Sequence, residues 1–252
     1  MSRPRRIQYP GALYHVTSRG NRRAVIFLDD RDHLIWMDLL GATVERYKFI
    51  VHAFCMMPNH YHLTVQTTDA NLSLGMHFLN SSYAQHFNHR HGLVGHVIQG
   101  RFHALLVERD THLLELSRYL PLNPVRTELV AAPEDWLWSS YRYYAGLART
   151  PCWLHTEWIL STLSTDPAQQ FARFRDFVHA GAGMENPLLG ASEHTSLREA
   201  APMTLQQYQA KYDDRGQAMA EAYLSHGFTM QEIADHFGVS TKTVGRMVKR
   251  YR

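Results

Sequence analysis

Cysteine is scarce in this chain of 252 residues, which contains only Cys55 and Cys152. The two stand far apart, so the sequence has no Cys-x-x-Cys pair and no disulfide framework of the kind that stabilises small secreted domains. A closed structural zinc site takes four protein ligands, and cysteine cannot supply them here.

Long apolar runs are also missing. No stretch of about 18 apolar residues occurs, which excludes a membrane-spanning helix. The basic start, residues 1–6, is not followed by an apolar segment and is therefore not typical of a signal peptide. These two absences predict a cytoplasmic protein.

Neither sign of charge dominates, because 26 Lys and Arg face 23 Asp and Glu, for a formal net charge of +3. This is a mild bias towards polyanionic partners. One basic cluster, Arg19, Arg22 and Arg23, follows the first predicted strand, although such a cluster is also typical of a solvated face. The hydrophobic content of 45% is enough for a sizeable core in one large domain or two small ones.

The most informative residues are His60 and His62. They lie in a run, 54–65, that predicts a buried strand after the turn Pro58-Asn59. Because strand side chains alternate, both imidazoles point to one face, about 7 Å apart at their bases, and Tyr61 points to the other. Two imidazoles on one rigid face can bind one metal ion, but an isolated pair is also common on ordinary polar surface.

A second pattern predicts a helix that carries Tyr119 and Asn123. Apolar residues recur there at helical spacing, at Leu113, Leu116 and Leu120. Residues four apart share a helix face, so Tyr119 and Asn123 lie together. Pro121 and Pro124 predict that the helix is distorted or ends here. By spacing alone, Tyr119 could equally be a packing aromatic and Asn123 a helix stop.

Five segments stand in an order that resembles a known family, the single-tyrosine HUH (IS200-like) transposases, and most closely the REP-associated tyrosine transposases. The segments are PNHYH at 58–62, YAQHFN at 83–88, GHVIQGRF at 95–102, YLPLNPV at 119–125 and WSSY at 138–141. Together they cover roughly residues 7–150. None is decisive alone, but five in order are fairly specific.

The resemblance implies a ferredoxin-like nuclease fold that cuts single-stranded DNA, and hairpin-forming strands are the expected substrates. It implies that Tyr119 attacks a phosphodiester and stays joined to the 5′-phosphate. It also implies that His60 and His62 hold a divalent metal ion, Mg²⁺ or Mn²⁺, with Asn123 at the place of the third ligand. Tyr61 stands where the family more often has an aliphatic residue, yet it still buries a large apolar body.

The chemistry of these residue types is consistent with that assignment. A tyrosine hydroxyl has a pKa near 10 and is a weak nucleophile, which a nearby divalent ion can help by stabilising developing charge. Two imidazoles and one amide oxygen would leave positions open for water and phosphate. A set formed by Cys55, His60, His62 and a distant residue remains an alternative, and the sequence does not select between Mg²⁺ and Mn²⁺.

Apolar periodicity in the first half predicts the order strand, helix, strand, strand, helix, strand, which is the ferredoxin-like α+β arrangement with an antiparallel sheet. The predicted strands are 12–17, 49–56, 60–66 and 102–108, and the predicted helices are 29–46 and 71–89. In the helices, Leu34 and Leu74 are each assigned to the apolar side. Tyr83 is interpreted as a packing or base-stacking residue, and Trp136 and Trp138 as cover for the core.

The pattern of the sequence changes after residue 150, where short helical segments and loop-like stretches replace the alternating strands and helices. We expect the nuclease domain at 1–150, a helical extension and linker at 151–215, and a helix-turn-helix at 216–252. Within the last segment, the sequence Thr229-Met230-Gln231-Glu232 is typical of a capping box, Gly238 of a tight turn, and Ser240 of a helix cap. The alternative for this segment is a small interaction bundle.

Basic and short polar residues at two places are the expected DNA contacts. They are Arg19, Arg22, Arg23 and Arg101 in the first half, and Ser240, Lys242, Thr243, Arg246, Lys249 and Arg250 at the end.

Three functions remain open on the sequence. The first is a metal-dependent, transposase-like endonuclease that cuts and rejoins single-stranded DNA, in a bacterial cytoplasm and associated with the nucleoid. The second is a DNA-binding regulator that has lost cleavage, which the presence of His60, His62 and Tyr119 argues against. The third is an unrelated metal-dependent hydrolase, which lacks a paired carboxylate near the histidines. Monomer and homodimer are both compatible with the sequence.

Overall fold

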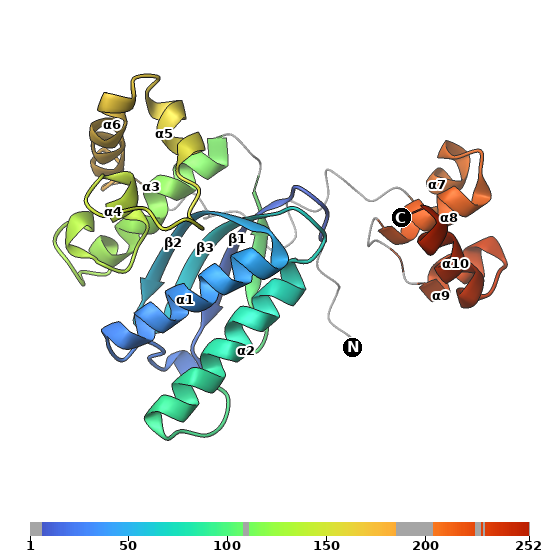
Figure 1. Cartoon of the computed structure of the whole chain (residues 1–252), viewed down its shortest axis with the longest axis horizontal. Coiled ribbons are helices and arrows are strands. Elements are labelled where there is room, and N and C mark those ends of the chain that lie inside the picture. Colours follow the sequence, from blue (N-terminus) through green and yellow to red (C-terminus); the bar gives the residue numbers. More distant parts are fainter. Residues whose placement is uncertain (1–6, 108–110, 185–203, 225–227, 229, 252) are drawn as a thin grey trace. The chain divides into compact units, whose positions relative to one another are not determined.

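Four antiparallel strands form one sheet in the computed structural model, in the order β2-β3-β1-β4 (Figure 1). They are β1 (Leu13–Arg19), β2 (Phe49–Met57), β3 (His60–Thr67) and β4 (His103–Leu106). The predicted α+β class and ferredoxin-like order are confirmed. The structure describes residues 7–107, 111–184, 204–224, 228 and 230–251, in two compact units: Gly11–Glu193, and His194–Arg252 with the first ten residues.

Helices α1 (Asp30–Tyr47) and α2 (Leu72–His91) lie side by side on one face of the sheet (Figure 1). The Asp29 carboxylate begins α1 by accepting from the backbone N–H groups of Arg31 and Asp32. The expected inward positions Leu34 and Leu74 were wrong, since both are more than half exposed. The buried side of α1 runs through Leu40, which the apolar spacing had placed inward, and through Trp36, which it had not.

The other face of the sheet is covered by α3 (Thr111–Arg126), with α4 (Tyr141–Tyr144), α5 (Glu157–Leu163) and α6 (Pro167–His179) in the same apolar cluster. The unit that contains the sheet also has two short 3-10 helices, Asn21–Arg23 and Pro133–Asp135. The Trp136 indole donates to the Met56 carbonyl at 2.9 Å, and the Trp138 ring stacks on His33. The predicted covering role of both tryptophans is therefore confirmed.

Helix α3 continues through Pro121 and Pro124 and ends two residues later, at Arg126, so an end at the prolines themselves was wrong. Proline has no N–H, and Pro124 therefore leaves the carbonyl of Leu120 without its helical donor. The Asn123 side-chain amide donates to that same carbonyl at 3.2 Å. A side chain thus replaces the missing backbone bond and lets the helix continue.

The C-terminal unit holds α7 (Leu205–Lys211), α8 (Arg215–Leu224), α9 (Met230–Phe237) and α10 (Thr241–Tyr251). Helix α7, with its capping box at Thr204, was not predicted separately. Gly238 has a φ of 62° in the turn before α10, and the Ser240 hydroxyl accepts from the Thr243 N–H at 3.2 Å, so both predicted roles are confirmed. The capping box predicted at Thr229 lies outside the described residues.

None of the helices within the described ranges has the length and apolarity needed to cross a membrane.

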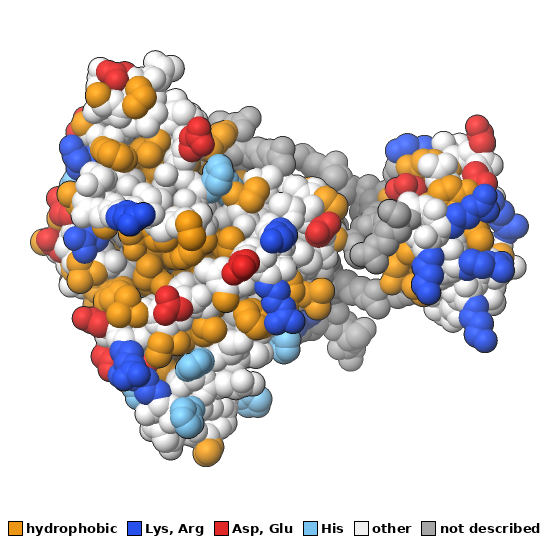
Figure 2. Space-filling view, viewed as in Figure 1, with side chains coloured by type: hydrophobic (Ala, Val, Ile, Leu, Met, Phe, Trp, Pro, Cys, Tyr) orange, Lys and Arg blue, Asp and Glu red, His pale blue; other side chains and the backbone are white. Residues whose placement is uncertain are grey.

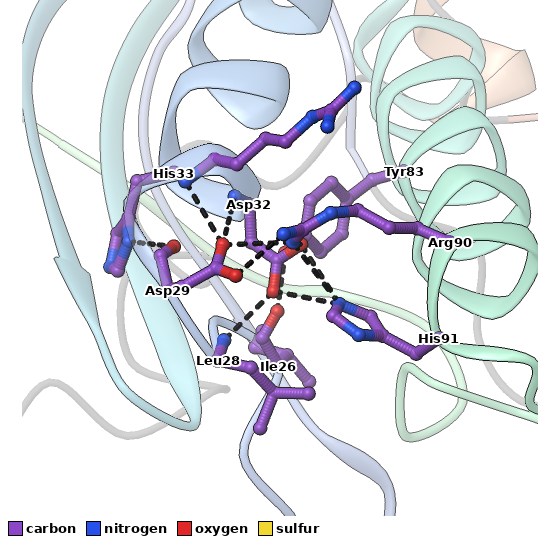
Figure 3. Close-up of polar contacts among 9 residues, drawn as sticks. Ile26, Leu28, Asp29, Asp32, His33, Tyr83, Arg90 and His91 are labelled. Carbon is purple, nitrogen blue, oxygen red and sulfur yellow. Dashed lines mark hydrogen bonds and ion pairs between the residues drawn. The ribbon is translucent and has the colours of Figure 1, made fainter.

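A charged cluster ties the end of α2 to the start of α1 (Figure 3). The Arg90 guanidinium contacts both Asp29, at 2.8 Å, and the buried carboxylate of Asp32, and His91 lies 3.1 Å from Asp32. The Tyr83 hydroxyl donates to the Ile26 carbonyl beside them. The hydrogen bond from Arg90 is the largest cause that lowers the pKa of Asp29 to about 2.

We predict that Arg90→Met destabilises the fold in a pH-dependent way. The Asp29 pKa is lower in the folded chain, about 2, than its ordinary 3.8, so its contribution is present above about pH 4 and is lost as the pH falls towards 2. Melting temperatures of parent and variant should therefore differ most above pH 4 and converge near pH 2. Arg46→Met, which removes an exposed cation with ring contacts, is the control. A difference that stays constant from pH 5 to 2 would contradict the assignment.

Candidate metal and tyrosine site

His60 and His62 project from the same face of β3, and their ring centroids are 5.0 Å apart at an interplanar angle of 80°. The intervening Tyr61 is fully buried on the opposite face, where its hydroxyl donates to Asn80 Oδ1 at 2.6 Å. The alternation expected from the sequence therefore holds, and the two imidazoles converge as a metal-binding pair would need.

The turn residue Asn59 determines which nitrogen of His60 carries the proton. The Asn59 Nδ2 donates to the Arg23 carbonyl at 3.2 Å, which orients the amide, so its Oδ1 is the atom 2.6 Å from His60 Nδ1. An amide oxygen only accepts, so Nδ1 of His60 is the donor. The lone pair on Nε2 of His60 is therefore available to a cation.

His62 has two polar neighbours on β1 that the sequence did not suggest. Its Nδ1 lies 3.0 Å from His15 Nε2 and 3.3 Å from Thr17 Oγ1. Thr17 is its direct cross-strand partner, and His15 is the diagonal one. The signal that could have revealed them is the alternation Leu13, His15, Thr17, which places two polar groups on a single strand face.

The imidazoles of this face are held neutral. Burial, followed by the positive charge of Arg19, lowers the pKa of His60 to about 4. Burial is also the main cause that lowers the pKa of His62 well below its ordinary value, with His15 and His60 contributing. A metal binds the neutral imidazole, so both rings are in the form that can bind a metal at neutral pH.

Tyr119 and Asn123 lie on α3, the helix that packs on the face of the sheet bearing His60 and His62. Tyr119 is in one apolar cluster with Cys55, and Cys55 is the direct cross-strand partner of His62. The Arg126 guanidinium lies 4.6 Å from the centroid of the Tyr119 ring. Asn123 is also buried, and its Nδ2 is engaged by Leu120, which leaves Oδ1 as its candidate ligand atom.

The alternative set with Cys55 does not fit the site. Burial raises the pKa of the Cys55 thiol, so the thiolate that a metal needs is disfavoured. Across the described part of the chain, no three His, Cys, Asp or Glu side chains are arranged to hold a metal ion. A donor set of two imidazoles and one amide oxygen is compatible with this finding, because it has only two such side chains.

Tyr83, for which the sequence left packing and base stacking open, is a packing residue. It is 1% exposed, its hydroxyl is engaged by the Ile26 carbonyl, and burial raises its pKa. The packing interpretation of Tyr83 is therefore confirmed.

The basic residues after β1 form a turn beside His60. Arg19 is the cross-strand partner of His60 and is exposed. The exposed Arg22 and Arg23 have φ values of 53° and 61°, in the left-handed region that costs non-glycine residues free energy. The Gly20 N–H donates to the Asn59 carbonyl, and the Asn59 side-chain amide donates to the Arg23 carbonyl, so both contacts hold this turn in place. Strain maintained by surrounding contacts is typical of functional sites.

The loop after α2 runs along the same turn. The Asn21 N–H donates to the Val97 carbonyl, and the Gln99 N–H donates to the Arg19 carbonyl, each at 2.8 Å. The loop is thus held at the end of β1, and the exposed Arg101 follows Gln99 by two residues. Arg90, at the end of α2, is instead engaged by Asp29 and Asp32.

Helix α10 presents a basic face in the C-terminal unit. Lys242, Arg246 and Lys249 are exposed at spacings of four and three residues, and Val244 and Val248 are buried on the opposite side. Arg250 is also exposed, and Figure 2 shows Lys and Arg side chains gathered over this unit. Ser240 and Thr243 lie at the start of the same helix.

Comparison with protein families agrees with these features. The family described as "Transposase IS200 like" matches residues 8–121, which include His60, His62 and Tyr119. That part of the chain is similar to the IS200-like transposase family. A second family, described as a homeodomain-like domain, matches residues 210–252 and includes α8, α9 and α10. The helix-turn-helix expected at the end of the chain is thereby supported.

Two known proteins are similar to this chain. A protein of Haemophilus influenzae described as a REP-associated tyrosine transposase is 27% identical over 159 residues, which are 56% of this chain and 86% of the relative. A solved structure of a REP-associated tyrosine transposase bound to a REP hairpin has a TM-score of 0.50 at 20% identity, and covers 62% of this chain and 92% of that one. The second similarity establishes the shared fold.

Proposed function

We propose that the chain is a REP-associated type of transposase that cleaves and rejoins single-stranded DNA through a covalent bond to Tyr119. The observation that supports this best is the pair of neutral imidazoles, His60 and His62, on the sheet face that α3 covers. The Nδ1 atom of each is engaged by a neighbouring polar group, and α3 carries the candidate nucleophile.

His60, His62 and Asn123 are the proposed ligands of one divalent ion, Mg²⁺ or Mn²⁺. When bound, such an ion polarises a phosphoryl oxygen and stabilises the negative charge that develops during displacement. The chain's own contribution is orientation: Asn59 holds the proton of His60 on Nδ1, and Asn123 is fixed within α3 by its bond to Leu120. Mn²⁺ is the better first probe, because imidazole accepts it more readily than Mg²⁺.

The proposed reaction is a transesterification at phosphorus. The Tyr119 oxygen bonds to phosphorus and loses its proton, while the bond from phosphorus to the 3′ oxygen of the preceding nucleotide breaks. That oxygen takes up a proton and becomes a free 3′-hydroxyl, and the 5′-phosphate stays on Tyr119. Rejoining is the reverse displacement by a 3′-hydroxyl, so no external energy source is needed.

The proposed substrate is single-stranded DNA that forms a hairpin, and the solved relative is described as bound to a REP hairpin. The exposed cations beside the histidines, Arg19, Arg22, Arg23 and Arg101, would contact phosphates. The proposed domain division keeps the chemistry at 1–150, with 216–252 as a separate DNA-binding segment. The proposed place of action is the DNA of a bacterial cytoplasm.

We predict that Tyr119→Phe abolishes the covalent protein–DNA adduct, because only the hydroxyl oxygen can bond to phosphorus. Hairpin oligonucleotides with Mn²⁺ and denaturing gel electrophoresis measure the adduct, and fluorescence anisotropy should show hairpin affinity within about twofold of the parent. Tyr83→Phe is the matched control and should keep the adduct. An adduct formed by Tyr119→Phe at the parental level would refute the assignment. Binding without any adduct in the parent would favour a non-cleaving regulator.

We predict that Arg22→Gly with Arg23→Gly makes the chain more stable but weakens its DNA binding. Glycine adopts positive φ without strain, for a gain of roughly 0.5–1 kcal/mol per position. Each lost phosphate contact should flatten the slope of log affinity against log salt by about 0.7. Lys48→Gly is the control, because Lys48 has a φ of 56° at the end of α1, and it should gain stability with unchanged binding. Equal DNA affinity of the double variant and the parent would contradict the phosphate role.

We predict that replacing Lys242, Arg246 and Lys249 by Gln weakens DNA binding and flattens its salt dependence, by about 0.7–0.9 in slope for each phosphate contact removed. Cleavage at saturating DNA should persist, because the proposed ligands and nucleophile lie before residue 125. The control replaces the exposed Arg31, Arg149 and Arg173 by Gln, which gives the same change in net charge. If both triple variants behave alike, α10 belongs to an interaction bundle and its basic face is only solvated.

A further inference from the structure

His15 is a buried histidine with an incomplete set of hydrogen bonds. It is 2% exposed on β1, and its Nδ1 has no hydrogen-bond partner in the described structure. Its Nε2 lies 3.0 Å from Nδ1 of His62, the proposed metal ligand. Leaving a polar nitrogen without a partner in the interior costs free energy, so an apolar side chain would serve packing alone better.

The contact between His15 and His62 is a hydrogen bond between ring edges. The two ring planes are only 11° apart and their centroids are 5.2 Å apart. Face-to-face contact would keep the ring atoms at van der Waals distance, about 3.5 Å or more, whereas the two nitrogens approach to 3.0 Å. The rings therefore share one proton between Nε2 of His15 and Nδ1 of His62.

The position of that shared proton decides whether His62 can bind a cation. If His15 donates it, the remaining proton of neutral His62 sits on Nε2 and blocks that atom. If His62 donates it, Nε2 of His62 presents a lone pair, as Nε2 of His60 does through Asn59. The Thr17 hydroxyl, 3.3 Å from the same Nδ1, is a second possible acceptor.

We propose that His15 is the positioning residue of His62, accepting its Nδ1 proton so that Nε2 of His62 faces a divalent cation. This inference rests on the proposed function, because it takes His62 as a metal ligand. It gives each histidine of the pair its own orienting partner: the amide of Asn59 for His60, and the imidazole of His15 for His62. His15 itself does not touch the cation or the DNA.

The test compares His15→Phe with the parent in the full chain without DNA, using Mn²⁺ alone and electron paramagnetic resonance to count the free ion. Phenylalanine keeps the ring and removes the acceptor, so affinity for Mn²⁺ should fall about 10- to 100-fold. The melting temperature should stay the same or rise, because the unpartnered nitrogen is gone. His15→Gln, which restores an acceptor, should recover part of the affinity.

His52→Phe is the matched control, since His52 is another buried histidine of the sheet and lies on β2. It should leave Mn²⁺ affinity unchanged. A parent that binds no Mn²⁺, or that binds it equally well after His60→Ala and His62→Ala, would refute the proposed metal site and this inference with it. If those variants lose Mn²⁺ while His15→Phe binds it like the parent, only the role of His15 is overturned.

Nitrogen-15 NMR of the unaltered, metal-free protein gives a second measurement that does not depend on any variant folding. His62 should carry its proton on Nδ1. A signal showing His62 protonated on Nε2 would overturn the proposal.

Discussion

The two-residue alternation along β3 is the constraint on which both faces of the sheet depend. Tyr61, Leu63 and Val65 point to one face and fill the core beneath α1 and α2. His60 and His62 point to the other face, which α3 covers. A slip of one residue in the pairing of β3 would turn His60 and His62 into the core beneath α1 and α2. It would also move Tyr61, Leu63 and Val65 out of that core, to the face covered by α3. The cost of that exchange fixes the register, and the register in turn fixes the site.

The pairing of β3 with β1 adds the surroundings of the histidines. It sets Thr17 opposite His62 and Arg19 opposite His60, and it brings His15 within hydrogen-bond distance. The corner Pro58-Asn59, through which the chain enters β3, also anchors the turn that carries Arg22 and Arg23. The orientation of His60 and the strained arginine turn therefore both depend on contacts of Asn59.

Several features around the histidines lower the stability of the unit that contains the sheet, and contacts elsewhere in that unit offset this cost. Neutral imidazoles lie in an apolar environment, one of their nitrogens has no partner, and two arginines adopt left-handed backbone angles. The opposing contributions are the apolar clusters on both faces and the tie between Arg90 and the two aspartates (Figure 3). The fold holds its unfavourable groups at one place because the rest of the sheet is well packed.

The C-terminal unit has a separate apolar core, around Ile233, Phe237, Val244 and Val248. Its helices do not need the sheet to bury their apolar faces. A separate core is what the proposed role of the basic helix α10 requires, because α10 would add DNA affinity without taking part in the proposed chemistry.

The sequence by itself determined the strand and helix order, the shared face of His60 and His62, and the burial of Tyr61. All three follow from side-chain period, which is a local property of the chain. It also determined the turn at Gly238 and the cap at Ser240. Only the tertiary structure decided that Trp36 rather than Leu34 faces the sheet, because packing selects among several apolar stripes. The same holds for α3, where Asn123 supplies the bond that Pro124 removes, and for His15, whose partner is 47 residues away and is reached only through sheet pairing.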